Sequence, residues 1–182
     1  MNTSLPQKNN TTLLIIDVQE RLRPAIAESE SVIAAVNQLI QGAQILNLPI
    51  LVTEQYPKGL GHTVPEVILP EGTPILEKIC FSCMHSENVS QSLKSKSTKH
   101  LIIAGIESHI CVLKTTLDAI EQGYTVHVVA EAISSRSLAN KQLALERMRQ
   151  AGAYIVSVEM ILFMLLEQAG TEDFKAISKL IK

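Results

Sequence analysis

The stretch Leu101-Ile102-Ile103-Ala104-Gly105-Ile106 decides the fold. It is a continuous apolar run, which is typical of a strand buried on both faces of a sheet. The amphipathic segment from Cys111 to Gln122 follows after a short turn and ends at Gly123, the residue type that most often closes a helix. A buried strand followed directly by a helix is the repeating unit of a parallel α/β sheet.

The same alternation extends along the chain in both directions. Short apolar runs predict strands, and longer segments with apolar residues three and four apart predict helices. The expected strands are residues 13–16, 50–52, 74–76, 101–106, 125–129 and 153–156. The expected helices are residues 31–46, 88–93, 111–122, 138–150, 158–168 and 171–181. We therefore predict an α/β fold, a doubly wound parallel sheet of about six strands with helices on both faces.

Length and composition indicate one folded unit. The chain has 182 residues, and domains usually run to roughly 100–200 residues. No repeat, low-complexity tract or linker divides it, so we predict a single domain over residues 1–182, with residues 1–10 as a flexible N-terminal tail. Residues 54–73 are rich in proline and glycine and should form a long surface excursion, which in a compact domain is often functional.

Charge and aromatic content argue against several kinds of partner. The formal net charge is −2, and only three Tyr, three Phe and no Trp are available to stack on bases, so we expect no nucleic-acid partner. The apolar runs fall far short of the roughly 18 residues of a membrane span, and residues 1–10 lack the features of a signal peptide, so we expect no membrane partner. Three cysteines, an odd number, favour a reducing, cytoplasmic location.

Three residues with useful chemistry follow predicted strands, where ligands bind in such sheets. Asp17 follows the first strand, Lys78 follows the third, and Cys111 stands at the expected start of a helix. Free N–H groups and the helix dipole stabilise a thiolate there, so we expect a lowered pKa for Cys111. Each residue also has an ordinary structural interpretation: a buried core thiol, a strand-end carboxylate and a solvated lysine.

Other motifs give weaker signals. Cys80-Phe81-Ser82-Cys83 is a single C-x-x-C, which can be a redox pair but more often supplies unpaired thiols to a loop. His109, two residues before Cys111, is expected to line a pocket or to support the structure. Residues 158–166 are apolar on more than one helical face, which is compatible with burial in the core alone or with contact to a second subunit.

The order of these residues resembles the isochorismatase-like cysteine hydrolase superfamily. The resemblance covers roughly residues 12–158. It is carried by Asp17-Val18-Gln19, Lys78 with Phe81, Gly105-Ile106-Glu107-Ser108-His109-Ile110-Cys111-Val112, Asp118-Ala119 and Gly123-Tyr124. Thr53-Glu54-Gln55-Tyr56-Pro57 and Gly61-His62-Thr63 are most similar to the isochorismatase domain-containing branch.

The resemblance implies a catalytic triad of Asp17, Lys78 and Cys111. The aspartate would accept the thiol proton, the lysine would stabilise the charges, and the thiolate would attack an amide-type carbon to give a thioester that water hydrolyses. The backbone N–H groups of Glu107 and Cys111 would form an oxyanion hole, and a cis peptide would join Ile106 to Glu107. The substrate pocket would be lined by Gln19, Tyr56, Phe81, His109 and Ile110.

Two departures from the family narrow the activity. Family nicotinamidases carry an Asp-x-His metal motif after the second strand, whereas this chain has Thr53-Glu54-Gln55-Tyr56, so we expect no metal and no other cofactor. Isochorismatases that cleave vinyl ethers lack the cysteine present here as Cys111. We therefore expect a metal-independent hydrolase of a small amide or ureido-type substrate, in a homo-oligomer as is the family's habit. The alternative is a catalytically slow or inactive member that binds a small molecule and acts in regulation.

Overall fold

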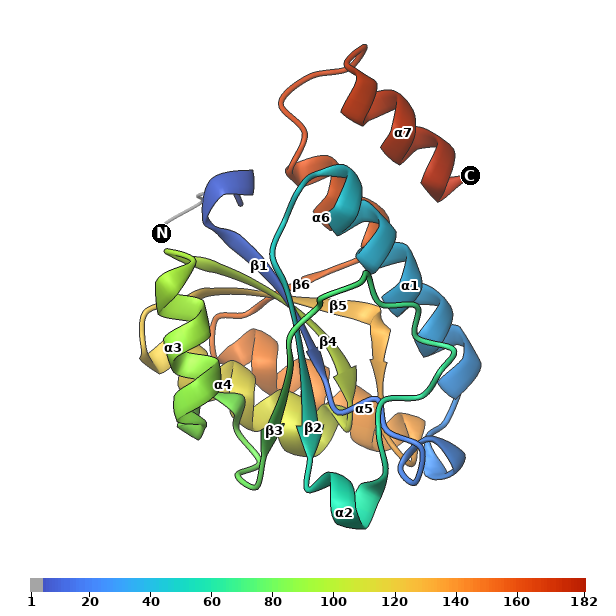
Figure 1. Cartoon of the computed structure of the whole chain (residues 1–182), viewed down its shortest axis with the longest axis vertical. Coiled ribbons are helices and arrows are strands. Elements are labelled where there is room, and N and C mark those ends of the chain that lie inside the picture. Colours follow the sequence, from blue (N-terminus) through green and yellow to red (C-terminus); the bar gives the residue numbers. More distant parts are fainter. Residues whose placement is uncertain (1–4) are drawn as a thin grey trace.

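The computed structural model describes residues 5–182, arranged around a parallel sheet (Figure 1). The 6-stranded sheet has the order β3-β2-β1-β4-β5-β6, and every neighbouring pair is parallel. The strands are β1 (Thr11–Ile16), β2 (Ile50–Gln55), β3 (Ile75–Lys78), β4 (His100–Ile106), β5 (Thr125–Ser134) and β6 (Tyr154–Val156). The doubly wound parallel sheet predicted from the sequence is confirmed.

Helices cover both faces of this sheet. They are α1 (Ser29–Ile45), α2 (Pro57–Leu60), α3 (Glu87–Ser95), α4 (Leu113–Glu121), α5 (Leu138–Gln150), α6 (Val158–Met164) and α7 (Glu172–Ile181). Helices α1, α6 and α7 belong to one face, and α3, α4 and α5 to the other (Figure 1). The short α2 lies beyond the end of β2, below the sheet in this view.

Two apolar layers, one on each face of the sheet, hold these helices in place. Along β1, Leu13 and Ile15 pack into the layer that contains α1, whereas Leu14 and Ile16 pack into the layer that contains α3 and α4. All four side chains are at most 1% exposed. Strands that are covered on both faces need apolar residues at every position, which is why the sequence shows continuous runs instead of an alternation.

The excursion predicted at residues 54–73 begins later than expected, because β2 continues to Gln55. The chain then forms α2 and returns beside the segment after β1, where Gln19 and Thr63 form an isolated antiparallel bridge. Val64 and Val67 are buried, so the excursion is anchored in the core on the α1 side.

Two terminal segments differ from expectation. Residues 1–4 lie outside the described part of the chain, but Lys8–Asn10, within the predicted tail, form a short 3-10 helix, and the Lys8 ammonium pairs with Asp173 of α7. Helix α6 ends at Met164 instead of residue 168. Phe163 of α6 packs edge-to-face on Phe174 of α7, so the chain's own last helix covers part of the apolar segment 158–166.

Candidate active site

The carboxyl ends of three strands bring Asp17, Lys78 and Cys111 together. Asp17 directly follows β1, Lys78 ends β3, and Cys111 lies in the turn between β4 and α4. These strand ends all point downward in Figure 1, toward α2. The three residues are 0%, 4% and 7% exposed, respectively. Two charged side chains and a thiol therefore share a nearly closed site at one edge of the sheet.

Lys78 and Asp17 form a fully buried ion pair. Lys78 Nζ lies 2.7 Å from Asp17 Oδ2, and both side chains are 0% exposed. The lysine side chain must reach across β2, because β3 pairs with β2 and not with β1. Its ammonium also donates to Gln55 Oε1 at 2.7 Å and to the carbonyl oxygens of Cys80 and Phe81 at 3.3 and 3.4 Å. A buried ion pair needs such additional partners to offset its lost hydration.

Asp17 is held by its backbone as well as by its side chain. Its φ of 52° is left-handed, a conformation that aspartate adopts more readily than most residues, and its N–H donates to the carbonyl oxygen of Thr53. The Thr53 hydroxyl donates to Asp17 Oδ1 at 2.7 Å, so each carboxylate oxygen has a separate donor. The carboxylate therefore has a single defined orientation toward the centre of the site.

Burial and the ion pair shift the pKa values of Asp17 and Lys78 in opposite directions. Burial raises the pKa of Asp17, and Lys78, Thr53 and the Cys111 thiol oppose that rise. Burial lowers the pKa of Lys78, but the attraction of Asp17 and the nearby Cys83 and Cys111 outweighs it, so the lysine pKa is raised overall. The pair therefore favours the charged form of Lys78, whereas burial favours the neutral form of Asp17.

Cys111 sits on an unusual turn. The peptide bond between Ile106 and Glu107 is cis, as the resemblance implied. Residues Ser108–Val112 then form one π-helical turn, and α4 begins only at Leu113. The Glu107 carbonyl oxygen accepts hydrogen bonds from the N–H groups of Ile110 and Val112 at 3.1 and 3.3 Å. Single π-helical turns of this kind are frequent at functional sites.

A glycine lets β4 approach β1 closely just before this turn. Gly105 has a φ of 119°, and a Cβ atom at this position would lie 2.0 Å from the carbonyl oxygen of Ile16. No other residue type fits that space without moving the backbone. The close approach of the two strands brings the turn that carries Cys111 beside Asp17, which follows Ile16.

The expected direction of the Cys111 pKa is wrong for this structure. Burial and the Asp17 carboxylate raise the pKa of Cys111, and Lys78 only partly opposes them. The lowered pKa was expected from the free N–H groups at a helix start, but burial of the thiol and the charge of Asp17 outweigh them at this position. Burial and the neighbouring Asp17 carboxylate therefore favour the protonated form of the Cys111 thiol.

Gln19, which is predicted to contact substrate, holds the backbone on either side of α2. Its side chain is fully buried. Gln19 Nε2 donates to the carbonyl oxygens of Gln55 and Gly61 at 3.1 and 2.7 Å, and its Oε1 accepts from the Gln55 N–H at 2.7 Å. Both amide hydrogens are thus used to join the two ends of the α2 segment.

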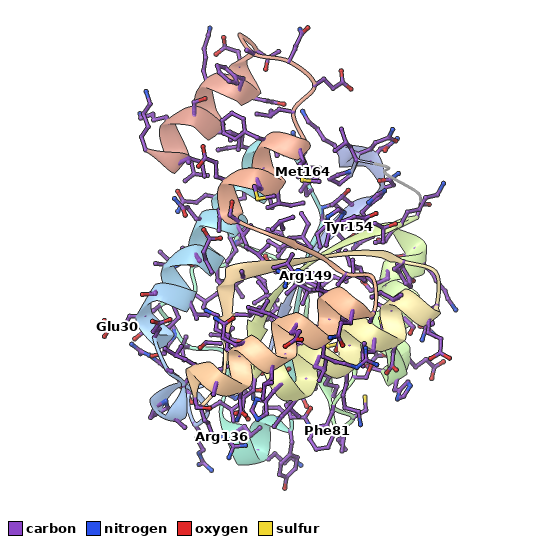
Figure 2. All side chains as sticks on the ribbon, turned by 180° about the vertical axis from the view of Figure 1, so that it is seen from behind. Glu30, Phe81, Arg136, Arg149, Tyr154 and Met164 are labelled. Atoms are coloured by element: carbon purple, nitrogen blue, oxygen red, sulfur yellow. The ribbon has the colours of Figure 1, made fainter. Side chains whose placement is uncertain are left out.

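The other four residues expected to contact substrate lie at the same end of the sheet. Tyr56 and Phe81 are each 53% exposed, and Figure 2 shows Phe81 at the lower edge of the molecule. His109 Nδ1 lies 2.9 Å from the Ser135 hydroxyl oxygen. Ile110 is partly buried against the layer beneath α4. The structure thus brings these four residues to the edge that carries Cys111.

Sequence reasoning missed three polar partners of the site. Thr53 and Gln55 contact the ion pair directly, and Arg136 Nε donates to Glu107 Oε1 at 2.8 Å beside the cis peptide. Figure 2 shows Arg136 at the same lower end as Phe81. The spacing of Thr53 and Gln55, two apart at the end of a strand, is the signal that could have found them, since such side chains share a face.

The cysteines, one cavity and the arrangement of possible metal ligands add three further findings. All three cysteines are free, and burial raises the pKa of Cys83 to about 11, which disfavours a redox role for the C-x-x-C. A cavity of about 970 Å³ is lined mainly by residues 5–9 and 164–168, and it contains none of the three clustered residues. Across residues 5–182, no group of three or more His, Cys, Asp or Glu side chains is arranged to hold a metal ion.

Fold and site together define a class of protein: a parallel α/β protein with a buried Asp–Lys pair and a thiol at the carboxyl ends of its strands. The chain belongs to the isochorismatase family, whose isochorismatase domain model matches residues 11–160. Isochorismatase domain-containing protein 2 from Danio rerio is 42% identical and aligns over 94% of this chain and 86% of its own.

Solved structures give the same result. The structure of MAR1 ribonuclease from Caenorhabditis elegans has a TM-score of 0.92 and 40% identity, covering 98% of this chain and 92% of its own. YcaC from Pseudomonas aeruginosa, with covalent acrylamide, has a TM-score of 0.89 and 27% identity over 99% and 93%. YcaC from Escherichia coli, described as an octameric hydrolase of unknown specificity, has a TM-score of 0.84 and 25% identity over 97% and 88%.

Proposed function

We propose that this protein is a metal-independent cysteine hydrolase that cleaves a small amide or ureido-type substrate through a thioester on Cys111. The observation that carries the proposal is the fully buried Asp17–Lys78 ion pair, which lies close enough to the Cys111 thiol to change its pKa. Burying two charges gives little net stability, whereas perturbed ionisable groups are concentrated at sites of catalysis. Membership of a hydrolase family supports the same reaction class.

The first half of the reaction forms the thioester. Asp17 accepts the Cys111 proton as the sulfur attacks the substrate carbonyl carbon, and the carbonyl electrons move onto oxygen. The backbone N–H groups of Glu107 and Cys111 stabilise that oxyanion. Asp17 then returns the proton to the leaving nitrogen as the C–N bond breaks, and ammonia or an amine departs. Lys78 stays protonated throughout, and its positive charge stabilises the negative charge of Asp17 and of the Cys111 sulfur in turn.

The second half regenerates the enzyme. Asp17 takes a proton from a water molecule, whose oxygen attacks the thioester carbon. The C–S bond breaks, the acid product leaves, and Cys111 recovers its proton. The raised resting pKa of Cys111 fits this scheme, because thiolate forms during attack and does not persist in the free enzyme.

The substrate pocket is proposed to include Tyr56, Phe81, His109 and Ile110, with no nucleic acid as substrate. The MAR1 relative carries the name ribonuclease, so RNA is the obvious competitor. An RNA strand would have to reach Asp17, Lys78 and Cys111, none of which is more than 7% exposed. It would also have to bind a chain whose net charge is −2. Incubation with structured and unstructured RNA tests this, and cleavage that depends on Asp17 would overturn the small-molecule assignment.

The decisive experiment uses acrylamide, an amide that a thiolate captures by adding its sulfur to the β-carbon while a proton goes to the α-carbon. Cys111 should be modified in the wild type, much more slowly in Asp17→Asn, and not at all in Cys111→Ser. Cys80→Ser is the control, because Cys80 is a partly exposed thiol outside the ion pair. Ammonia release from a panel of small amides then tests turnover. Equal modification of wild type and Asp17→Asn would contradict the mechanism.

A slow or inactive binding protein is the second candidate, favoured by the buried, high-pKa Cys111 thiol. It predicts no ammonia release with any amide and no acrylamide adduct, but a thermal shift with at least one small amide. Ammonia release that disappears in Cys111→Ala would exclude this candidate.

We also propose a cytoplasmic homo-oligomer, a dimer or larger, in which residues 1–182 act as one domain. The octameric YcaC relative and the exposed Met160 and Phe163 on α6 support association. Reduced Cys111, which the mechanism requires, supports a reducing compartment. Within residues 5–182 no helix has the length and apolar character of a membrane-spanning segment. A monomeric mass by light scattering at micromolar concentration would refute the oligomer.

A further inference from the structure

Strand β2 lies between the two strands that carry the ion pair. The order β3-β2-β1 puts it between Lys78 at the end of β3 and Asp17 after β1. In register, Thr53 pairs with Ile16, the residue before Asp17, and Gln55 pairs with Lys78. Side chains two apart on a strand point to the same face. The end of β2 therefore presents a hydroxyl and an amide to the two members of the pair.

We infer that Thr53 and Gln55 are positioning residues for the reaction proposed above. Thr53 donates to one oxygen of Asp17 and leaves the other to Lys78; both contacts are 2.7 Å. Gln55 Oε1 accepts from the lysine ammonium at 2.7 Å, so an uncharged group holds the cation in place. This inference rests on the proposed function, because it assigns both residues to the same site.

The orientation of the Gln55 amide is fixed from both sides. Its Nε2 donates to the Ile79 carbonyl oxygen at 2.6 Å, so its Oε1 must face Lys78. Its backbone N–H and C=O both bind the side-chain amide of Gln19. A flipped amide would place two N–H groups against an ammonium and lose the bond to Ile79. Gln55 can therefore present only an acceptor to the lysine.

The neutrality of Gln55 has a consequence for Cys111. The ammonium has three hydrogens, and its acceptors are Asp17, Gln55 and the carbonyl oxygens of Cys80 and Phe81. Of these acceptors, only Asp17 carries a charge. A second carboxylate at position 55 would compete for the lysine and add negative charge near the sulfur, which disfavours thiolate. An uncharged acceptor immobilises the cation without that effect.

The test for Gln55 is the pH dependence of acrylamide addition to Cys111, followed by mass spectrometry of the cysteine peptides. Gln55→Met should slow addition at neutral pH roughly ten- to a hundredfold, the range expected for loss of one hydrogen bond to a charged group. Gln55→Glu keeps an acceptor but should shift the profile to higher pH. The matched controls are Gln38→Met and Gln38→Glu, since Gln38 also bonds a backbone carbonyl, that of Leu180, far from the site.

The test for Thr53 uses rescue by the conservative variant. Thr53→Val keeps the shape but removes the donor to Asp17, and should slow acrylamide addition about tenfold or more. Thr53→Ser retains the hydroxyl and should restore most of the rate. Thr12→Val is the control, because this variant loses a part-buried 2.7 Å hydroxyl–hydroxyl contact with Thr98 at the opposite end of β1. It should lower the melting temperature and leave the rate unchanged.

The outcomes separate this inference from the proposed function. If Asp17→Asn leaves acrylamide addition unchanged, the proposed function itself fails. If Asp17→Asn abolishes addition while the Gln55 variants keep the wild-type pH profile and Thr53→Val keeps the wild-type rate, only the positioning roles are overturned. If the variants lower the melting temperature as the controls do and change nothing else, Thr53 and Gln55 are structural residues only.

Discussion

Removing the Lys78 ammonium should destabilise the folded protein, because the buried Asp17 carboxylate then has no cation beside it. Lys78→Met keeps most of the side-chain volume but leaves Asp17, which is 0% exposed, without its cation. Breaking a buried pair from one side costs about 3–5 kcal/mol. At about 2–4 °C per kcal/mol for a chain of this size, the melting temperature should fall by roughly 6–20 °C.

The pH dependence and two controls sharpen this prediction. Burial already raises the pKa of Asp17, and loss of Lys78 raises it further, so the variant should be least stable at high pH and regain stability as pH falls and Asp17 becomes protonated. Urea unfolding at pH 5 and pH 8 measures the difference. Asp17→Asn/Lys78→Met should recover much of the loss, and Lys8→Met, which removes an exposed pair, should cost less than about 1 kcal/mol. A loss below about 1 kcal/mol with no pH dependence would refute a buried ionic pair.

Two further predictions concern other parts of the fold. His127, stacked on His100 with ring nitrogens 3.2 Å apart, has a pKa lowered to about 4 by burial. Its neutral form is favoured in the folded state, so up to about 3 kcal/mol of stability should be lost as pH falls from about 6.5 to about 4. Urea titrations of wild type and His127→Gln test this, and equal acid sensitivity would contradict it. Gly105→Ala would force a Cβ against Ile16 and should cost well over the roughly 1 kcal/mol expected of Gly123→Ala, where space is open, as measured by thermal melting.

The sequence predicted most of the architecture, and the exceptions have physical reasons. Strands buried on both faces, such as β1 and β4, are continuous apolar runs and cannot be mistaken for amphipathic helices of their length. The predicted end of α6, residue 168, was wrong. Apolar residues continue past Met164 into the turn toward α7, where they are buried without being helical. The periodicity of apolar residues indicates which positions are buried. It indicates where a helix ends only when a capping residue is present.

Parallel strands bring their carboxyl ends to one edge of the sheet, so the sequence offered Asp17, Lys78 and Cys111 as candidates, and the family resemblance implied that they act together. Tertiary structure alone decided the electrostatics. Asp17 and Cys111 come from different strand ends, so the sequence could not show that burial and the carboxylate together raise the pKa of the thiol. Nor could it show that Thr53 and Gln55 contact the pair, since that depends on β2 lying between β1 and β3. Local pattern determines which segments are buried, but strand order and register determine which charges become neighbours, and interactions between charges fall off with distance in space and not along the chain.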